Sequence, residues 1–275
     1  MNAMQRSDYW LKVERLRTKL DRKYSSLFYG VLKGELESFA KSVKTNGPQA
    51  AISLLGAANW DDKIIPILRD MYREVGVTFG NATFRAVSVD SKKAANPFGL
   101  NDEFLDELMS FLIQWGFYLA SLMAKTTKDR LIILVTKAMA DGLSTEDIVF
   151  LILSDPQLRY AKYRATMIAR TEVMRASNYA SLKGAQKHPF LVDKMWIATR
   201  DARTRRIPKD FYDHWNMDGQ TVEYNQPFVS ADKVGRPIVV DAPGDPRAPK
   251  GFTINCRCAV AFIPRRDANG QLIMK

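Results

Sequence analysis

Apolar residues recur at helical spacing through most of the chain before His188. The first example is the segment 4–24, where Trp10, Val13, Leu16 and Leu20 are spaced for one face of a charged, amphipathic helix. The pattern predicts further helices at 26–45, 48–57, 61–76 with a break at Pro66, 101–124, 127–141, 145–154 and 157–186. Residues 80–100, which are rich in Gly, Asn and Pro, are predicted to form a loop.

Two of these helices carry further signals. Ser144 followed by Asp147 has the spacing of a capping box, with Asp in place of the usual Glu or Gln. The stretch 108–124 approaches the minimum length of a membrane span. Polar residues interrupt it and acidic residues precede it, so we interpret it as a buried core helix.

The pattern changes after His188-Pro189. Residues 190–263 hold six of the twelve prolines, many turn signals and short apolar runs at 195–198, 238–240 and 259–262, which predict short strands. The predicted fold is therefore α+β. A mainly helical N-terminal part precedes a small C-terminal α+β domain, whose short strands pack on the long helix 157–186.

That long helix places a carboxylate on a packing face. Small and apolar residues share this face with Glu172; they are Ala161, Ala165, Ile168, Ala176 and Tyr179. A buried carboxylate needs a partner, and arginine binds it best because its two N–H groups match the two oxygens. We expect Arg203 and Arg205 to be these partners. Asp201 and His214 are expected to join the same structural network.

The composition is that of a globular chain, and its net positive charge suggests an acidic binding partner. The net charge is +11 and the pI is near 9.6, which makes nucleic acid the first candidate. Basic residues concentrate in 1–24 and 156–187, whereas 25–155 is slightly acidic. The candidate DNA contacts on the long helix are Arg159, Lys162, Arg164, Arg175, Lys183 and Lys187.

The two cysteines both lie in Cys256-Arg257-Cys258. A bridge between such close neighbours is strained, so reduced thiols in a reducing compartment are expected. Two thiolates and His214 would supply three zinc ligands. Cys-X-Cys is a poorer zinc motif than Cys-X-X-Cys, and the chain has no second pair. We therefore expect no metal and no other cofactor.

An ordered series of motifs in the last half of the chain resembles one family. The matching residues are, in chain order, Gly142-Leu143-Ser144, Arg170-Thr171-Glu172, Asn178, Trp196, Asp201, Arg203 to Arg205, His214, Gly219-Gln220, Pro243-Gly244-Asp245-Pro246 and Asn255 to Cys258. This order resembles minor head proteins of tailed bacteriophages, the head-morphogenesis family typified by phage Mu protein F. The resemblance covers roughly 138–263. The histidine usually follows the Arg-Thr-Arg element closely in this family, and here residues 206–213 intervene.

The resemblance implies three parts. They are a variable helical region at 1–137, the minor head domain at 138–265 and a tail at 266–275. It also implies that Asn255 to Cys258 forms a buried strand that closes the domain. The further residues that it marks as structural are Arg170, Thr171, Trp196 and Gly219.

The implied function is that of a minor structural protein of the phage head rather than an enzyme. Such a protein is made in the host cytoplasm and ends in the virion, without a membrane. Its implied role is in procapsid and head assembly, with DNA packaging or ejection as an extension. The expected partners are the portal protein, the major capsid or scaffolding protein, and packaged double-stranded DNA bound without sequence specificity.

Two other classes of function stay open at this point. One is an enzyme of head maturation, a nuclease or a peptidase that uses Glu172, Asp201 and His214 as its acid–base groups. The other is a non-specific DNA-binding protein with no role in the capsid. Binding to DNA without association with a portal ring would distinguish the second class.

Aromatic residues are spread through the N-terminal helices, Trp10, Phe28, Phe39, Trp60, Phe104, Phe111, Trp115 and Phe117 among them. They fit either a self-contained helical core or exposed anchors for a partner. We expect the helices at 4–24 and 26–45 to be separable and to dock on the portal or a neighbouring capsid protein.

Overall fold

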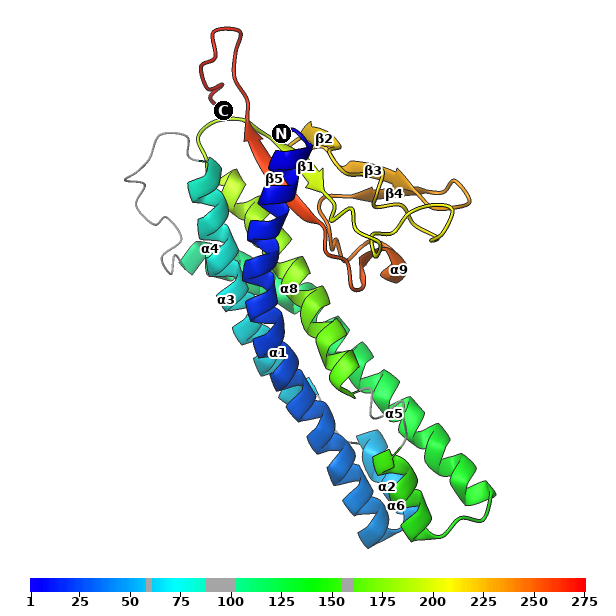
Figure 1. Ribbon diagram of the computed structural model, residues 1–275. Coiled ribbons are helices and arrows are strands. Elements are labelled where there is room, and N and C mark those ends of the chain that lie inside the picture. The colour runs from blue at the N-terminus through cyan, green and yellow to red at the C-terminus, as the bar shows by residue number, and fades with distance from the viewer. Residues whose placement is uncertain (58–60, 88–101, 155–160) are drawn as a thin grey trace. The chain divides into compact units, whose positions relative to one another are not determined.

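A computed structural model of the chain describes residues 1–57, 61–87, 102–154 and 161–275 (Figure 1). Long helices fill the chain up to residue 186, and short antiparallel strands follow, which confirms the α+β class. The helices at 48–57 and 145–154 have the predicted bounds, as α2 (Pro48–Ala57) and α6 (Thr145–Ser154). Ser144 is confirmed as the N-cap of α6, since the Asp147 N–H donates to Ser144 Oγ over 3.1 Å and Ser144 Oγ donates to Asp147 Oδ2 over 2.6 Å.

The N-terminal segment is one helix rather than two. Helix α1 runs from Ala3 to Asn46 without interruption. Neither Gly nor Pro lies near the break expected at residue 25, and Tyr24 and Phe28 are both buried one turn apart across it. The same buried face therefore continues through the expected break, and packing outweighs the weak local signal of Ser25-Ser26.

Helix α3 (Asp61–Val87) also runs further than predicted, through Pro66 and Gly80. Pro66 costs one hydrogen bond, but buried residues on both sides of it hold the helix; they are Ile64, Leu68, Met71, Tyr72 and Val75. A Cβ on Gly184 would lie 2.7 Å from the Gly80 carbonyl oxygen. Gly184 therefore permits close contact between α8 (Ala161–Gln186) and α3, while a Cβ on Gly80 itself would lie 2.9 Å from the Phe104 ring.

The apolar middle segment is divided differently from the prediction. Helix α4 (Asp102–Phe111) leads into a π-helical turn, η1 (Leu112–Gly116), and α5 (Phe117–Ala140) follows without the break expected at residue 125. None of the helices in the described ranges combines the length and apolar character that a bilayer crossing requires. The remainder of the predicted loop, 88–100, lies outside the described residues, as do Trp60 and Arg159.

The strands form two small antiparallel sheets. In the larger one, β1 (Val192–Ile197) lies between β2 (Thr221–Glu223) and β5 (Ala259–Pro264). The second is the hairpin of β3 (Phe228–Ala231) and β4 (Pro237–Val240). The runs at 195–198, 238–240 and 259–262 are thus confirmed as strand sequences. A short helix, α9 (Lys250–Thr253), precedes β5.

The segment from Asn255 to Cys258 is not the strand that was expected. It is a turn between α9 and β5, and Asn255 has a left-handed backbone with φ of 57°. Its N–H donates to Thr171 Oγ1 rather than to a neighbouring strand, over 2.9 Å. The segment is buried at both cysteines, as expected, but it is held by side chains instead of a β-ladder.

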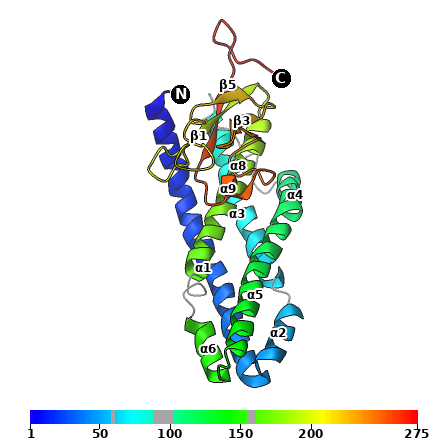
Figure 2. The same ribbon diagram turned by 90° about the vertical axis from the view of Figure 1, so that its right-hand side faces the viewer.

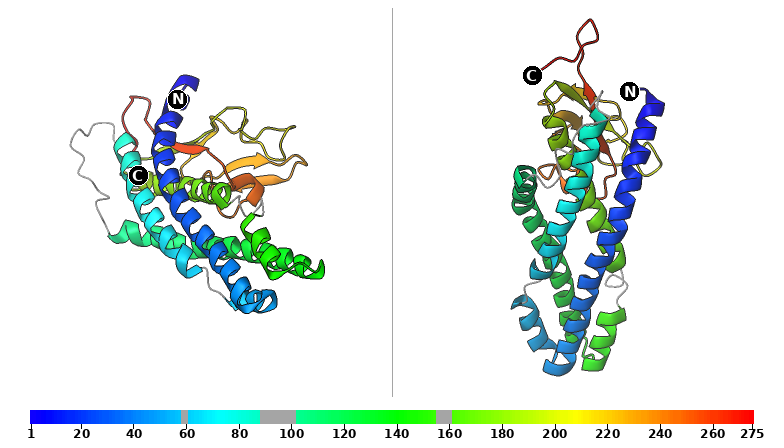
Figure 3. Two further views of the ribbon diagram at one scale, coloured as in Figure 1. Left: turned by 60° about the horizontal axis from the view of Figure 1, so that its bottom comes forward. Right: turned by 90° about the vertical axis from the view of Figure 1, so that its left-hand side faces the viewer.

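The chain forms two compact units. Unit 1 contains Met1–Asp21, Met71–Met109 and Arg170–Lys275, and unit 2 contains Arg22–Asp70 and Ser110–Ala169. Within unit 2, α5 lies beside both α2 and α6 (Figures 2 and 3). Each unit draws on residues from both sides of residue 137. The division into 1–137, 138–265 and 266–275 describes the extent of the family-like segment and stays a prediction.

The core of unit 1 lies around Trp196. Phe228 and Phe252 contact its ring, with centroids 5.4 and 6.2 Å away. The other buried members of the cluster are Met174, Ala198, Met217, Ile238, Val240, Cys256, Cys258 and Val260. The core thus joins α8, both sheets and the turn before β5.

The first five turns of α1 belong to this unit. The Tyr9 hydroxyl donates to the Val260 carbonyl, and the Trp10 indole N–H donates to the Arg257 carbonyl. Arg17, only 3% exposed, donates to Ser177 Oγ, Asn178 Oδ1 and the carbonyls of Arg257 and Cys258. The segment 4–24 is therefore not separable from the C-terminal domain, which corrects that expectation.

We predict that Arg17→Ala destabilises unit 1 by about 3 kcal/mol or more, because it leaves several buried acceptors without donors. Arg15→Ala is the matched control, since Arg15 is an exposed arginine on the same helix. Chemical denaturation of both variants measures the difference. Equal stability of the two variants would contradict the structural role of Arg17.

Candidate functional site

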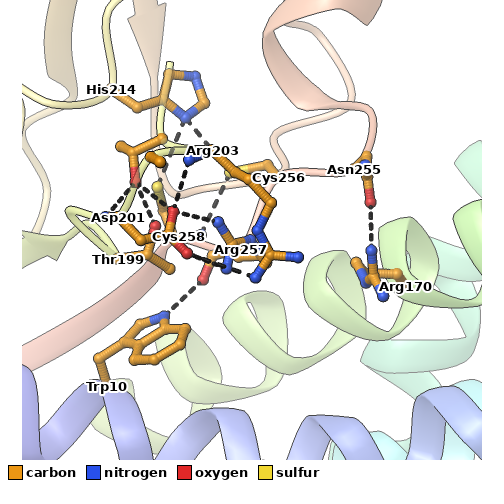
Figure 4. Close-up of polar contacts among 12 residues, drawn as sticks. Trp10, Arg170, Thr199, Asp201, Arg203, His214, Asn255, Cys256, Arg257 and Cys258 are labelled. Atoms are coloured by element: carbon orange, nitrogen blue, oxygen red, sulfur yellow. Dashed lines mark hydrogen bonds and ion pairs between the residues drawn. The ribbon is translucent and has the colours of Figure 1, made fainter. Parts of the chain in front are cut away.

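The motif Arg170-Thr171-Glu172 lies on α8 and holds the turn at Asn255 (Figure 4). Arg170 Nη1 donates to Asn255 Oδ1 over 3.0 Å, and Thr171 Oγ1 accepts the Asn255 N–H. An asparagine tolerates the left-handed backbone found there better than other non-glycine residues. These two motifs, 84 residues apart at Thr171 and Asn255, are thus one structural element.

Glu172 is buried and paired, but its partners differ from the prediction. The carboxylate accepts from Arg175 Nη1 over 2.5 Å and from the Tyr72 hydroxyl over 2.9 Å. Glu172 is 2% exposed and Arg175 is 4% exposed. Burial and the neighbouring Glu172 carboxylate raise the pKa of Tyr72 well above its usual value. The tyrosine therefore stays a hydrogen-bond donor at neutral pH.

Arg203 and Arg205 do not reach Glu172. Arg203 is an exposed neighbour of Asp201, and Arg205 Nη2 donates to the Ile254 carbonyl over 2.6 Å. Arg175 lies on the same helix, three residues from Glu172. It was predicted to contact DNA, and for that reason it was not considered as the partner of Glu172. Arginine side chains are long enough to satisfy a carboxylate one turn away, so the sequence offered this pairing as well.

Asp201 belongs to a separate ion pair. Its two carboxylate oxygens accept from Arg257 Nη1 and Nη2 over 2.8 and 2.6 Å, a bidentate arrangement (Figure 4). These hydrogen bonds hold the pKa of Asp201 well below its usual range. The pair ties the 199–205 loop to the Cys256-Arg257-Cys258 segment. Arg257 was not predicted to have this role.

Asn178 connects the helix α8 to three other segments. Its Oδ1 accepts from Arg17 Nη2 and from the Val260 N–H, and its Nδ2 donates to the carbonyls of Pro243 and Cys258. Every polar group of this 2% exposed amide is used. The presence of Asn178 among the family motif residues is therefore explained by its buried hydrogen bonds rather than by a catalytic or binding role at the surface.

The Pro243-Gly244-Asp245-Pro246 segment lies against α8. Arg175 Nε donates to the Gly244 carbonyl over 3.0 Å. Gly244 has a φ of 85°, and a Cβ there would lie 2.8 Å from Met174 Sδ. Only glycine satisfies both the backbone and the close approach. Gly219 has a similar backbone, with φ of 86°; its N–H donates to the Trp196 carbonyl, and the Trp196 N–H donates to the Gln220 carbonyl.

His214 contacts both cysteines. Its Nδ1 lies 3.5 Å from Cys256 Sγ and 3.5 Å from Cys258 Sγ, and each of the three residues is 2% exposed. The hydrogen bond from the Cys258 thiol, together with His214, lowers the pKa of the Cys256 thiol well below its usual value. The same interaction with Cys256, together with burial, raises the pKa of Cys258. The two thiols are therefore inequivalent, with Cys256 the more acidic of the pair.

The insertion before His214 forms a closed loop. The backbone N–H groups of His214 and Trp215 both donate to the Arg205 carbonyl, over 2.9 and 3.0 Å. This contact brings His214 directly back to the Arg-Thr-Arg element. Within the loop, Tyr212 packs edge-on against Phe252, and the Phe211 carbonyl accepts the Lys233 N–H of the β3–β4 turn.

Most of the side chains predicted to contact DNA are paired with other side chains of the protein. Arg175 is buried in the Glu172 pair, which rules it out as a surface contact. Lys183 pairs with Glu107, Lys187 pairs with Glu103, and Arg164 donates to Thr127 Oγ1. Lys162 is exposed. Arg159 is not among the described residues. Of the predicted DNA contacts, Lys162 is therefore the exposed one, and the others that the structure describes are paired with neighbouring side chains.

The three residues proposed as catalytic are not brought together. Glu172 binds Arg175 and Tyr72, Asp201 binds Arg257, and His214 contacts the cysteines. Within the described ranges, no hydrogen bond links any two of the three. An acid–base mechanism needs such groups to converge on one reacting atom, so this arrangement favours structural roles.

This geometry defines a class of protein, an α+β domain whose motif residues fasten a small sheet to long helices. Residues 130–261 match the family model described as Phage Mu protein F like protein, which supports the assignment of this segment to a bacteriophage head-morphogenesis family. The match confirms the resemblance expected from the motifs. It begins slightly before the predicted segment.

A curated relative is the uncharacterized protein YqbB of Bacillus subtilis (strain 168). It is 24% identical over 155 residues, which are 56% of this chain and 48% of the relative. The chain thus matches only about half the length of that protein. No solved structure matches the chain.

We predict that Glu172→Ala costs about 3–5 kcal/mol of stability, because it leaves the Arg175 guanidinium buried without its counter-charge. Glu103→Ala is the control, since Glu103 is 68% exposed in its pair with Lys187, and exposed pairs contribute about 1 kcal/mol or less. Thermal and urea unfolding compare the two. A loss below about 0.5 kcal/mol for Glu172→Ala would contradict the buried pair.

Proposed function

We propose that this protein is a minor structural protein of a tailed-phage head, associated with the portal or the inner capsid and required for head assembly. The observation that carries the proposal is the family match over residues 130–261. Within that match, the motif residues Arg170, Thr171, Glu172 and Asn178 make internal hydrogen bonds. Residues used in this way support a structural role over an enzyme of head maturation. The mature protein would then reside in the virion.

The docking surface is expected at α6 rather than at the N-terminal helix. Phe28, Phe39 and Phe104 are buried, so they belong to the core and not to a partner. On α6, by contrast, Phe150 is 69% exposed and Leu153 is 52% exposed. They lie three residues apart, so they share one helical face, opposite the buried Ile148 and Ile152. An exposed aromatic–aliphatic pair of this kind is a typical anchor for a protein partner.

We predict that Phe150→Glu combined with Leu153→Glu prevents incorporation into heads without unfolding the protein, because both side chains are exposed. Phage lacking the gene are complemented with the variant, and purified heads are assayed for the protein and for copurification with the portal. We expect incorporation to fall by about tenfold or more, the effect of losing roughly 1.4 kcal/mol or more of binding free energy.

The matched control is Val229→Glu with Val239→Glu. These valines are paired across β3 and β4 and are 51% and 54% exposed, so the control makes the same chemical change on the other compact unit. Normal incorporation of the α6 variant, with loss in the hairpin variant, would place the docking surface on the hairpin. If the wild-type protein is missing from purified heads and portal complexes, the proposed function itself is wrong.

A second candidate function, contact with packaged DNA, is supported by a basic pocket in the 200–215 region. The pocket has a volume of about 640 Å³, and its lining includes Arg200, Arg206, Lys209 and Trp215. The guanidinium carbons of Arg200 and Arg206 lie 4.6 and 5.1 Å from the Trp215 ring centroid. Because Asp201 is neutralised by Arg257, the pocket keeps an excess of positive charge. Cations beside an aromatic ring suit phosphate and base contacts.

We predict that Arg200→Gln, Arg206→Gln and Lys209→Gln together weaken DNA binding and reduce the salt dependence of log K by up to about 3, roughly one unit per lost phosphate contact. The control removes the same charge from exposed positions of α1, with Lys12→Gln, Arg15→Gln and Lys19→Gln. Fluorescence anisotropy with duplex DNA at several salt concentrations measures both. An equal effect of the two triple variants would mean that net charge alone binds DNA.

A further inference from the structure

The ring of His214 lies between two sulfur atoms that converge on the same nitrogen. Nδ1 is 3.5 Å from each Sγ, and the three potential ligand atoms lie within 4.8 Å of one another. All three residues are buried. The arrangement joins the end of the 199–214 loop to the turn before β5, two segments that the chain brings together from about 40 residues apart.

The distances fit a tetrahedral metal ion. Zinc binds sulfur at about 2.3 Å and imidazole nitrogen at about 2.0–2.1 Å, so tetrahedral angles place a sulfur and a nitrogen ligand about 3.5 Å apart. This is the separation found for both Nδ1–Sγ pairs. Contrary to the expectation of no metal drawn from the Cys-X-Cys spacing, we propose that His214, Cys256 and Cys258 bind one Zn²⁺ ion, which fastens the 199–214 loop to the start of β5.

Hydrogen bonding alone explains this geometry less well. A neutral imidazole nitrogen has one lone pair, so Nδ1 accepts fully from one thiol only. The other thiol hydrogen-bonds to the neighbouring sulfur, an arrangement that does not require both sulfurs to lie at the same distance from Nδ1. Zinc instead accepts an electron pair from each of the three atoms. Its binding displaces a proton from each thiol to solvent, and the two thiolate charges balance the charge of the ion.

The surroundings position the ligands. The Cys258 N–H points at Cys256 Sγ over 3.4 Å, a donor that stabilises a thiolate. The Cys258 carbonyl is fixed by Arg17 Nη1 and Asn178 Nδ2. The His214 ring packs against Phe252, with centroids 4.3 Å apart. A Cys-X-Cys pair is a weak chelator in a flexible loop, but here both cysteines and the histidine are pre-oriented by the fold.

Three protein ligands leave one position of the tetrahedron for a water molecule. Burial of all three ligands and the absence of a converging acid–base group among the described neighbours favour a structural ion over a catalytic one. The proposal is independent of the role in the phage head, because it concerns the stability of unit 1 and not its partner.

The test is elemental analysis of the full chain, purified with zinc present and then dialysed. We expect about one zinc per chain. His214→Gln, Cys256→Ser and Cys258→Ser are each expected to reduce the zinc content by at least about tenfold. His188→Gln is the matched control, because His188 is equally buried and stacks on Phe84, outside the site. It is expected to keep its zinc.

Two measurements on the wild-type protein serve if the variants fail to fold. Cobalt substitution should give the sulfur-to-metal charge-transfer absorption and the intense visible bands of a tetrahedral thiolate site. Both thiols should resist modification until a chelator removes the ion, and chelation should lower the melting temperature. The proposal fails if zinc-exposed protein holds no stoichiometric metal, or if bound cobalt shows no thiolate absorption.

Discussion

The buried guanidinium of Arg17 is the interaction on which the C-terminal domain depends. It donates to Ser177 and Asn178 on α8 and to two carbonyls of the Arg257–Cys258 segment, so one side chain joins three parts of the chain. Burial lowers the pKa of Arg17, although an arginine stays charged at any physiological pH. A buried charge of this kind is tolerated only where each donor finds an acceptor. The position of the turn before β5 is fixed by that requirement.

This requirement explains why the family motifs are polar yet internal. Asn178 uses both its oxygen and its nitrogen, Arg175 reaches the Gly244 carbonyl, and Arg170 reaches Asn255. The larger sheet of this domain has three short strands, and the second sheet is a two-stranded hairpin, which is marginally stable at best by itself. Side-chain hydrogen bonds to backbone groups replace the missing strand pairing. Apolar substitutions at these positions would leave the backbone groups of the turns without partners.

The sequence was sufficient for strands β1, β4 and β5, the N-cap of α6 and the buried face of α8, because each depends on local spacing. It predicted that Glu172 is buried and paired with an arginine, but it did not identify Arg175 as that arginine. Partner choice depends on where the 199–205 loop and the 255–258 turn lie, and no local pattern encodes this. Gly80 and Pro66 were misleading for the same reason. Contacts made by distant residues decided that both remain within a helix.

The sequence also treated the first helix as separate from the domain that follows, since nothing in residues 1–21 matches the family pattern. The structure shows that family resemblance and structural unit have different boundaries. Tyr9, Trp10 and Arg17 bond to the segment 257–260 at the far end of the chain. The segment that these residues hold also carries Cys256 and Cys258. The geometry of the cysteine–histidine cluster is therefore set in part by donors of α1, which lie outside the segment that matches the family.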